Sequence, residues 1–375
     1  MNVSTVKRTR KRTLSPYLQA FNIKAFGEDN LYPQRLSDIV NASPTGRGCL
    51  ARYARFIEGD GFKEGGDIEV SADGMTLDGI LHAAAEDVAK YNGFALHVNY
   101  NVLGEVTDLQ HIPFELCRLE EADDSGQVSH IIVHPDWQGL ATRSGRRVTV
   151  TEENTQRFDV YNDRASVVRA QMESVGGIDY YRGQVLWVSG DGGMAYPLPK
   201  YDSAVSEMST DEGISNVMAR NVRNNFLAAG ILYVRASQSS PTSQLGSYDF
   251  TEAIKMLQGD ERALSLLQVT LEPGEEKPTL DSFPTKNFDK DFAATEQALV
   301  ERIYCAFEQE PFLAIRNGKL GFSGTTIHDA YTYYSGVVSK EQRLICRSLG
   351  KVLKKWAWGV VPPLEVSQLR YSDNG

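Results

Sequence analysis

The chain has 375 residues, of which 41% are hydrophobic and 23% are charged, as expected for a globular protein of two or three domains with a sizeable core. No run of eighteen apolar residues occurs and no apolar segment follows the basic N-terminus, so we expect neither a membrane span nor a secretory signal. The net charge of −10 argues against a simple nucleic-acid wrapper, which would carry a basic excess.

The chain begins with a polar segment, residues 1–15, that has no hydrophobic periodicity and is expected to be disordered in isolation. It contains five basic side chains and no acidic ones among its first twelve residues: Lys7, Arg8, Arg10, Lys11 and Arg12. This cluster is suited to contacts with phosphates or with an acidic partner, and an uncommitted solvated tail fits it equally well.

Two short helices are predicted next. Pro33 suits a first helical turn, and Leu36, Ile39 and Val40 place apolar side chains on one face of a helix that ends at Ser43-Pro44. A second helix runs from Thr45 to about Ile57 and ends at Gly59. The spacing Gly59-x-Gly61-x-x-x-Gly65 resembles a dinucleotide-binding fingerprint, but it follows a helix rather than a strand, which favours a helix C-cap and turn.

A helix over Thr76–Tyr91 is followed by a change to period two, which indicates strands. Short turns separate these strands and predict an antiparallel meander. The four segments are 94–101, 105–112, 114–121 and 128–134, and two further strands are expected at Arg157–Tyr161 and Gln184–Val188. Residues 137–156 are interpreted as a surface excursion.

The second half begins with a helical segment from Asp202 to about Ala228, with an inward stripe that includes Met208, Ile214, and Val217 or Met218. A small α/β insert follows: a strand at Ile231–Val234, a loop at 237–247, a helix at about 249–258, and strands at Leu264–Thr270 and Leu280–Phe283. It is acidic, with eight acidic and three basic residues over 241–285.

The most unusual stretch is Asn287–Trp356. It contains a helix over about 288–308, closed by Pro311, and a basic loop up to Gly324. A helix then begins at the capping box Thr326–Asp329 and continues to about Trp356, roughly 45 Å at a rise of ~1.5 Å per residue. Residues 316–355 hold eight basic and two acidic side chains, although ordinary solvated helix faces would give a similar imbalance.

Catalytic motifs are not apparent, so no enzyme activity and no cofactor is predicted. His130 and His134 share a strand face and could ligate a metal, but no third ligand is suggested, which favours surface histidines. Ser189–Gly193 could hold an anion, and a turn is the simpler interpretation. The four cysteines have no CxxC spacing and are interpreted as reduced, buried thiols.

The loop Arg316–Gly324 is the best local candidate for phosphate contact. Its candidate residues are Arg316 and Lys319, which supply charge, and Asn317 and Ser323, which supply neutral hydrogen bonds, while its glycines are expected to supply mobility. A plain solvent loop between helices is the alternative.

Three phrases in this order resemble the portal proteins of tailed bacteriophages, particularly compact portals of the HK97-like and PBSX-like kind. They lie at about 21–62 (AFGEDNLYPQRLSDIVNASPTGRGCLARYARFIEGDGF), 196–234 (YPLPKYDSAVSEMSTDEGISNVMARNVRNNFLAAGILYV) and 288–355, beginning FDKDFAATEQALVERIYCAFEQEPFLAI. None of the three segments is a catalytic signature. The resemblance is specific because all three occur in the expected order.

The resemblance implies an α+β portal fold. Its parts would be a basic N-terminal arm (1–24), an α/β wing (25–200), a first stem helix (201–229), a small α/β clip (230–286), a second stem helix (287–309), a tunnel loop (310–325), a long helix back to the wing (326–358) and a short tail (359–375). A kink in the long helix is expected near Gly336. The short tail departs from portals that end in a helical crown, so the crown would be reduced or absent.

The resemblance also implies a structural role. The subunit would form a homo-oligomeric ring, usually dodecameric, at one capsid vertex of a virion made in the host cytoplasm. Double-stranded DNA would pass through it, and its partners would be the terminase large subunit, head-completion or adaptor proteins and the major capsid protein, with no membrane. The alternatives are a metal-dependent DNA-processing or packaging enzyme and a non-ring head adaptor or capsid protein.

Overall fold

The computed structural model describes residues 21–139, 142–143, 146–147, 150–223, 230–232, 280–282, 288–320 and 323–371. The chain divides into two compact units, residues 1–208 with 301–375 and residues 209–300. The fold is α+β, as predicted. Among the described residues, no helix is long and apolar enough to cross a membrane.

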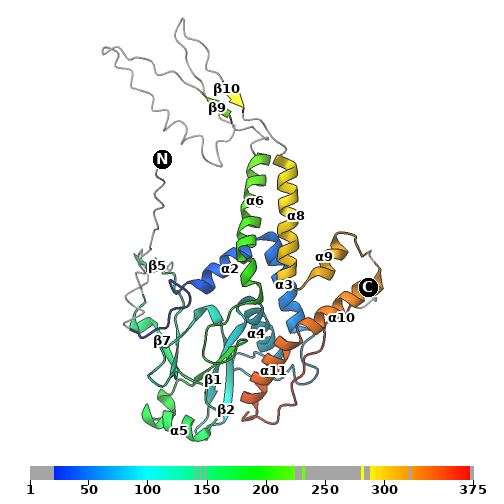
Figure 1. The fold of residues 1–375 in the computed structure, drawn as a ribbon. Helices are drawn as coiled ribbons and strands as arrows, with labels where there is room; N and C mark the ends of the chain where they lie inside the picture. The colour runs from blue at the N-terminus through cyan, green and yellow to red at the C-terminus, as the bar shows by residue number, and fades with distance from the viewer. Residues whose placement is uncertain are drawn as a thin grey trace, which may run out of the picture. The chain divides into compact units, whose positions relative to one another are not determined.

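The elements follow the chain in the order of the colours of Figure 1. The α-helices are α2 (Tyr32–Ala42), α3 (Pro44–Glu58), α4 (Leu77–Tyr91), α5 (Ala165–Ser174), α6 (Val205–Arg223), α8 (Phe288–Ala306), α9 (Glu310–Arg316), α10 (Gly324–Val337) and α11 (Ser339–Leu353). The strands are β1 (Gly93–Tyr100), β2 (Val106–Ile112), β3 (Cys117–Leu119), β4 (His130–Val133), β5 (Thr142–Arg143), β6 (Arg146–Arg147), β7 (Gln156–Val160), β8 (Gln184–Ser189), β9 (Gly230–Leu232) and β10 (Leu280–Ser282). Short 3₁₀ helices lie at Phe114–Leu116, Glu152–Asn154, Ile178–Tyr180 and Lys200–Ala204.

The three helices predicted before the sheet are confirmed as α2, α3 and α4, and local capping explains the ends of α3 and α4. The Ser43 hydroxyl accepts from the Gly46 amide at 2.9 Å and caps α3, and the Thr76 hydroxyl caps α4 through Gly79. Gly59 ends α3 with a φ of 64°, as the C-cap interpretation requires. A Cβ atom there would lie 2.1 Å from the Ser367 carbonyl oxygen, so glycine is required on steric grounds as well.

The main sheet has six strands in the order β2-β1-β8-β7-β4-β3, and the prediction of an antiparallel meander is wrong. The β1–β2 and β3–β4 hairpins form as expected, but β2 and β3 lie at opposite edges. Between the hairpins lie β8, which pairs with β1 antiparallel, and β7, which pairs with β8 in parallel. All six residues of β8 are buried, as is typical of a strand covered on both faces.

Helix α4 forms the middle layer of the first unit. It packs against β1 and β2 and also against α3 and α11 (Figure 1). Most of its side chains are buried. The C-terminal segment runs back over the same unit: the Val106 amide donates to the Lys355 carbonyl at 2.8 Å, and Phe62 pairs with Val366. The end of the chain is therefore fastened to both the sheet and the α3–α4 connection.

Buried Arg118 of β3 fastens the N-terminal segment to the sheet. Its guanidinium donates to the Asn30 side chain at 2.6 Å, the Asn30 carbonyl at 2.7 Å and the Glu115 carbonyl at 2.8 Å. It also lies 5.6 Å from the Phe26 ring centroid and 5.0 Å from that of Trp137, within the range of cation–π attraction. The residues just before α2 are thus held by a desolvated, multiply bonded charge.

The second unit contains most of α6 and α8 and a short antiparallel pair, β9 with β10. The strands predicted at 231–234 and 280–283 are confirmed over the residues described. Ile214 is buried, but Val217 and Met218 are 41% and 39% exposed, so the predicted inward position there is wrong for the single chain. The predicted loop at 237–247, helix at 249–258 and strand at 264–270 lie outside the described residues.

Candidate functional site

The predicted tunnel loop, residues 310–325, contains the residues that the sequence suggests for DNA contact. Its first half is helical rather than a loop. Glu310–Arg316 forms α9, so Pro311 opens a helix rather than closing the preceding one, consistent with the tolerance of proline in a first turn. Arg316 lies in the last turn of α9 and Lys319 three residues later, and both side chains are exposed.

The turn after α9 is fixed by backbone hydrogen bonds. Gly318 has a φ of 70°, its amide donates to the Ile315 carbonyl at 3.0 Å, and the Lys319 amide donates to the Ala314 carbonyl at 2.9 Å. This pair of bonds is a Schellman motif with Asn317 as the C-cap. Gly318 therefore ends α9 and places Lys319 directly after the turn.

Ser323 has a structural role at the other end of the loop. It is the N-cap of α10, and its hydroxyl accepts from the Thr326 amide at 3.2 Å. The predicted capping box at Thr326–Asp329 is therefore wrong, and the helix begins three residues earlier. Because the Ser323 oxygen is used by the cap, the two cations remain the strongest candidates for phosphate contact.

Gln309 holds the start of α9, and with it the loop that follows, in place by hydrogen bonds. It is fully buried between α8 and α9, directly after Glu308, whose backbone is left-handed with a φ of 55°. Its amide nitrogen donates to the Cys49 carbonyl at 2.9 Å and the Tyr334 hydroxyl at 2.8 Å, and its oxygen accepts from Arg52 at 2.7 Å. One side chain thus joins the α8–α9 corner to both α3 and α10.

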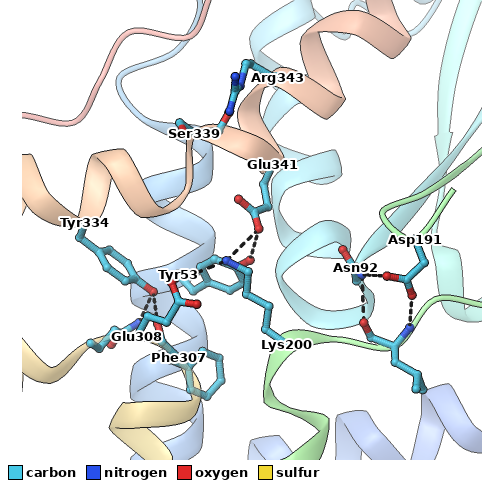
Figure 2. A network of polar contacts seen from close by, with 12 residues as sticks. Tyr53, Asn92, Asp191, Lys200, Phe307, Glu308, Tyr334, Ser339, Glu341 and Arg343 are labelled. Atoms are coloured by element: carbon cyan, nitrogen blue, oxygen red, sulfur yellow. Dashed lines mark hydrogen bonds and ion pairs between the residues drawn. The ribbon is translucent and has the colours of Figure 1, made fainter.

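An aromatic cluster surrounds this anchor. Phe56 of α3 lies 5.8 Å from Phe312 and 4.9 Å from Tyr334, measured between ring centroids, and Phe312 lies 5.5 Å from Tyr334. The edge-to-face geometry of the two contacts with Tyr334 is a favoured one for aromatic pairs. The Tyr334 hydroxyl donates to the Phe307 carbonyl at 2.9 Å (Figure 2), and burial raises its pKa above the ordinary value. The helix that leads to the exposed cations, α9, is therefore packed through Phe312 against α3 and α10.

The single long helix predicted after the loop is two helices, broken at Val338. The predicted kink near Gly336 is close, but a Cβ atom at Gly336 would meet nothing within 4 Å, so glycine is not required there. Val338 is fully buried and has a ψ of 0°, outside the value of a regular helix. The break brings Glu341 inward at the start of α11.

Glu341 joins α11 to α3 and to the segment before α6. Its Oε1 accepts from the Tyr53 hydroxyl at 3.0 Å and lies 3.0 Å from the Lys200 ammonium (Figure 2). Its Oε2 has no hydrogen-bond partner among the residues that the structure describes. Burial and the adjacent carboxylate raise the pKa of Tyr53. Tyr53 therefore stays protonated and donates to Glu341.

The remaining predicted sites do not assemble into a centre. His130 lies within 2.6 Å of Glu120, whereas buried His134 accepts from the Asp136 amide and contacts the Asn154 side chain. The expectation of a surface histidine is therefore wrong for His134, whereas the His130 side chain is 33% exposed. No group of three potential metal ligands occurs in the part of the chain that the structure describes.

Three further predictions can be compared with the structure. Ser189–Gly193 forms a turn in which Asp191 accepts from the Asn92 side chain at 3.2 Å (Figure 2). None of the four cysteines is disulfide-bonded; Cys49 and Cys117 are buried as expected, but Cys305 is exposed and Cys346 is half-buried. The arm residues Lys7, Arg8, Arg10, Lys11 and Arg12 lie outside the described residues.

Sequence reasoning identified Arg316 and Lys319 but missed Gln309 and Glu341. A glutamine directly before a Glu-Pro helix start and a glutamate within a basic helix were the available signals, and neither predicts burial. Their partners, Cys49 and Tyr53, are more than 250 residues away in the chain.

The first unit is an α+β fold, in which helices pack on a mixed six-stranded sheet. The loop with the exposed cations lies between α9 and α10, after which α10 and α11 carry the chain back to the sheet side. No protein-family model and no curated protein sequence matches the chain. Among solved structures, a chain described as "Neck of native GTA particle computed with C12 symmetry" is similar over 90% of this chain and 84% of that chain, with 12% identity and a TM-score of 0.50.

Two related structures match less well. A chain of the "Virion of native gene transfer agent (GTA) particle" has 13% identity and a TM-score of 0.49, covering 90% of this chain and 83% of that one. A chain of the "Neck of empty GTA particle computed with C6 symmetry" has 13% identity and a TM-score of 0.49, covering 87% and 82%. The shared fold of the C12 neck chain agrees with the portal-like α+β fold implied by the sequence resemblance.

Proposed function

We propose that this chain is a portal subunit: a structural protein that forms a ring-shaped homo-oligomer at one vertex of a phage-like capsid. Double-stranded DNA is packaged and ejected through the ring. The observation that carries this proposal is the fold match to a chain from a particle neck with C12 symmetry, because it extends over 90% of this chain and 84% of the other. Agreement over nearly the whole length supports a common architecture rather than one shared motif.

In this proposal, α6 and α8 are the stem helices, residues 230–286 form the clip, and the segment around α9 is the tunnel loop. The clip faces the terminase large subunit during packaging and head-completion proteins afterwards, and the wing faces the major capsid protein. The ring resides in the virion and has no enzymatic activity of its own. A chain with a net charge of −10 suits a conduit, since tight phosphate binding would stall the DNA.

Arg316 and Lys319 are proposed to face the passing DNA. Both are exposed, and the Schellman turn and the Gln309 anchor hold their backbone in place. A rigidly supported pair of cations gives a brief electrostatic contact to each phosphate without wrapping the duplex. Asn317 and Ser323 act mainly through the backbone, as C-cap and N-cap.

The test of the ring is light scattering after size-exclusion chromatography, together with negative-stain images. We expect a species near twelve times 41.6 kDa and rings with a central hole. A persistent monomer with metal-dependent nuclease activity would refute the proposal in favour of a packaging enzyme, and a small closed oligomer without a channel would favour an adaptor.

The test of the loop is the double variant Arg316→Ala, Lys319→Ala. We expect rings to assemble while packaging or DNA retention fails. The matched control is Arg55→Ala, Arg169→Ala, which removes two exposed cations from helices outside the loop. Normal packaging in the loop variant would remove the DNA role of these residues and leave the ring intact.

A further inference from the structure

Helix α11 and its C-cap residue, Lys354, carry a row of five cations on the exposed side. Lys340, Arg343, Arg347, Lys351 and Lys354 are spaced three or four residues apart, so they follow one face of the helix, and all five are exposed. From the first to the last, fourteen residues at ~1.5 Å per residue give a row about 21 Å long. The opposite face is fully buried at Ile345, Leu349 and Val352.

No acidic side chain of α11 lies on this face. The one acidic residue of the helix, Glu341, is 4% exposed and is paired with Tyr53 and Lys200. From neighbouring elements, Asp163 lies 3.8 Å from Lys351, and Glu365 lies beside Arg343 in a surface cavity and pairs with Lys63. The row therefore keeps a large positive excess.

The first three cations converge on one hollow. Lys340, Arg343 and Arg347 line a cavity of about 280 Å³ together with Asn92 and Gly190. Glu341 also lines it, with its charge offset by Lys200 at 3.0 Å. A phosphate group in this hollow would meet three cations at once, and Arg343 and Arg347 can each donate two parallel hydrogen bonds.

We infer that the exposed face of α11 is a second DNA-contact surface, which binds the phosphate backbone of duplex DNA without reading its sequence. The inference rests on the proposed function, which brings duplex DNA to this chain, and names a surface separate from the α9–α10 loop. Over about 21 Å of axis, one DNA strand presents about six phosphates, close to the five cations of the row.

A phosphate backbone fits this face better than an apolar protein segment does. The residues between the cations include Ser348 and Gly350, which are small, and a Cβ atom at Gly350 would meet nothing within 4 Å. Half-buried Leu344 is the apolar residue among those that line the hollow. Among the described residues of α11 no large apolar side chain is exposed, and the exposed Trp358 and Val360 lie beyond the C-terminal end of the helix. A row without apolar anchors is typical of electrostatic, sequence-independent binding.

The experiment measures binding of the full chain to a labelled duplex of about thirty base pairs as NaCl is varied from about 0.05 to 0.3 M. The variant is Lys340→Gln, Arg343→Gln, Arg347→Gln. The slope of log K against log[NaCl] should become shallower by about 2.7 for each subunit on the duplex, because each lost phosphate contact removes about 0.9. The control is Arg55→Gln, Arg164→Gln, Arg169→Gln, which makes the same change in net charge at exposed sites and should leave the slope unchanged.

An unchanged slope in the α11 variant, or an equal change in the control, would overturn the inference. If the α11 variant keeps its slope but no longer binds an acidic head protein, the face is a protein-docking surface and the inference is wrong. The loop variant Arg316→Ala, Lys319→Ala is measured in parallel. If only the loop variant changes the slope, the inference about α11 is wrong but the proposed portal function is unaffected. If the native chain does not form rings, the proposed function itself is refuted, whatever the slope.

Discussion

Replacing Gln309 by methionine tests whether the basic loop stands on a rigid anchor. Methionine has nearly the same length and is tolerated in cores, but it lacks the amide. The variant loses two hydrogen bonds donated to Cys49 and Tyr334 and one accepted from Arg52. The first two contribute about 1 kcal/mol each and the charge-assisted one about 1.5–3 kcal/mol. Because Arg52 is half-buried, its guanidinium can form hydrogen bonds to water in the variant, which offsets part of this cost. We therefore expect the free energy of unfolding to fall by about 3 kcal/mol.

The assay is denaturant unfolding at a fixed protomer concentration, since assembly shifts apparent stability by mass action. Gln342→Met is the matched control. Gln342 is also buried, but its amide donates one hydrogen bond, to the Phe56 carbonyl at 3.0 Å, so its replacement should cost about 1 kcal/mol.

A double-mutant cycle with Arg52→Met separates the charged contact from the rest. We expect a coupling of about 1.5–3 kcal/mol between positions 52 and 309. A loss below about 1 kcal/mol for Gln309→Met, or no coupling to Arg52, would show that the network does not hold the loop.

Two further predictions concern the sheet side of the first unit. Arg118→Lys should destabilise the protein by about 3 kcal/mol, because one ammonium cannot replace the bonds of the guanidinium to Asn30 and Glu115; a melting temperature equal to that of the native chain would contradict this. Burial lowers the pKa of His134, whose neutral Nδ1 accepts from the Asp136 amide at 3.0 Å. The stabilisation of the folded state by neutral His134 is therefore fully present above the ordinary pKa of about 6.5, and it is lost as the pH falls from there through the lower pKa of the folded state. His134→Gln should therefore flatten the fall of unfolding free energy below pH 6.5 in denaturant titrations, and parallel curves for the two proteins would refute the assignment.

The helices α2, α3 and α4 could be predicted because their signals are local. Ser43, Gly59 and Thr76 act within four residues of themselves, and the apolar stripes of α3 and α4 reflect a single buried face. The same reasoning misplaced Pro311, because a proline is compatible both with the end of one helix and with the first turn of the next.

The sheet order could not be predicted from neighbouring segments. Turn residues identified the two hairpins correctly, and the error was to pair β2 with β3 because they follow one another in the chain. The central position of β8 has a signature in its uniformly buried residues, but alternation and burial on both faces are hard to tell apart over six positions.

The candidate-site residues of the loop that sequence reasoning selected are exposed, and those that it missed are buried. Arg316 and Lys319 were evident from charge between two helical runs. The contribution of Gln309 depends on Cys49, 260 residues away, and on the closing of α3 against α10, which no local pattern encodes.

The parallel pairing of β7 with β8 has a consequence for the order of folding. The two hairpins can each form from nearby residues as the chain emerges from the ribosome, but they share no strand-to-strand contact. Only β8 and β7 join them, and β8 pairs with β1 across some ninety residues of chain. Sheet closure must therefore wait for Gln184–Ser189, and until then the nascent chain exposes the unpaired edges of β1 and β4, which are open to pairing with other chains.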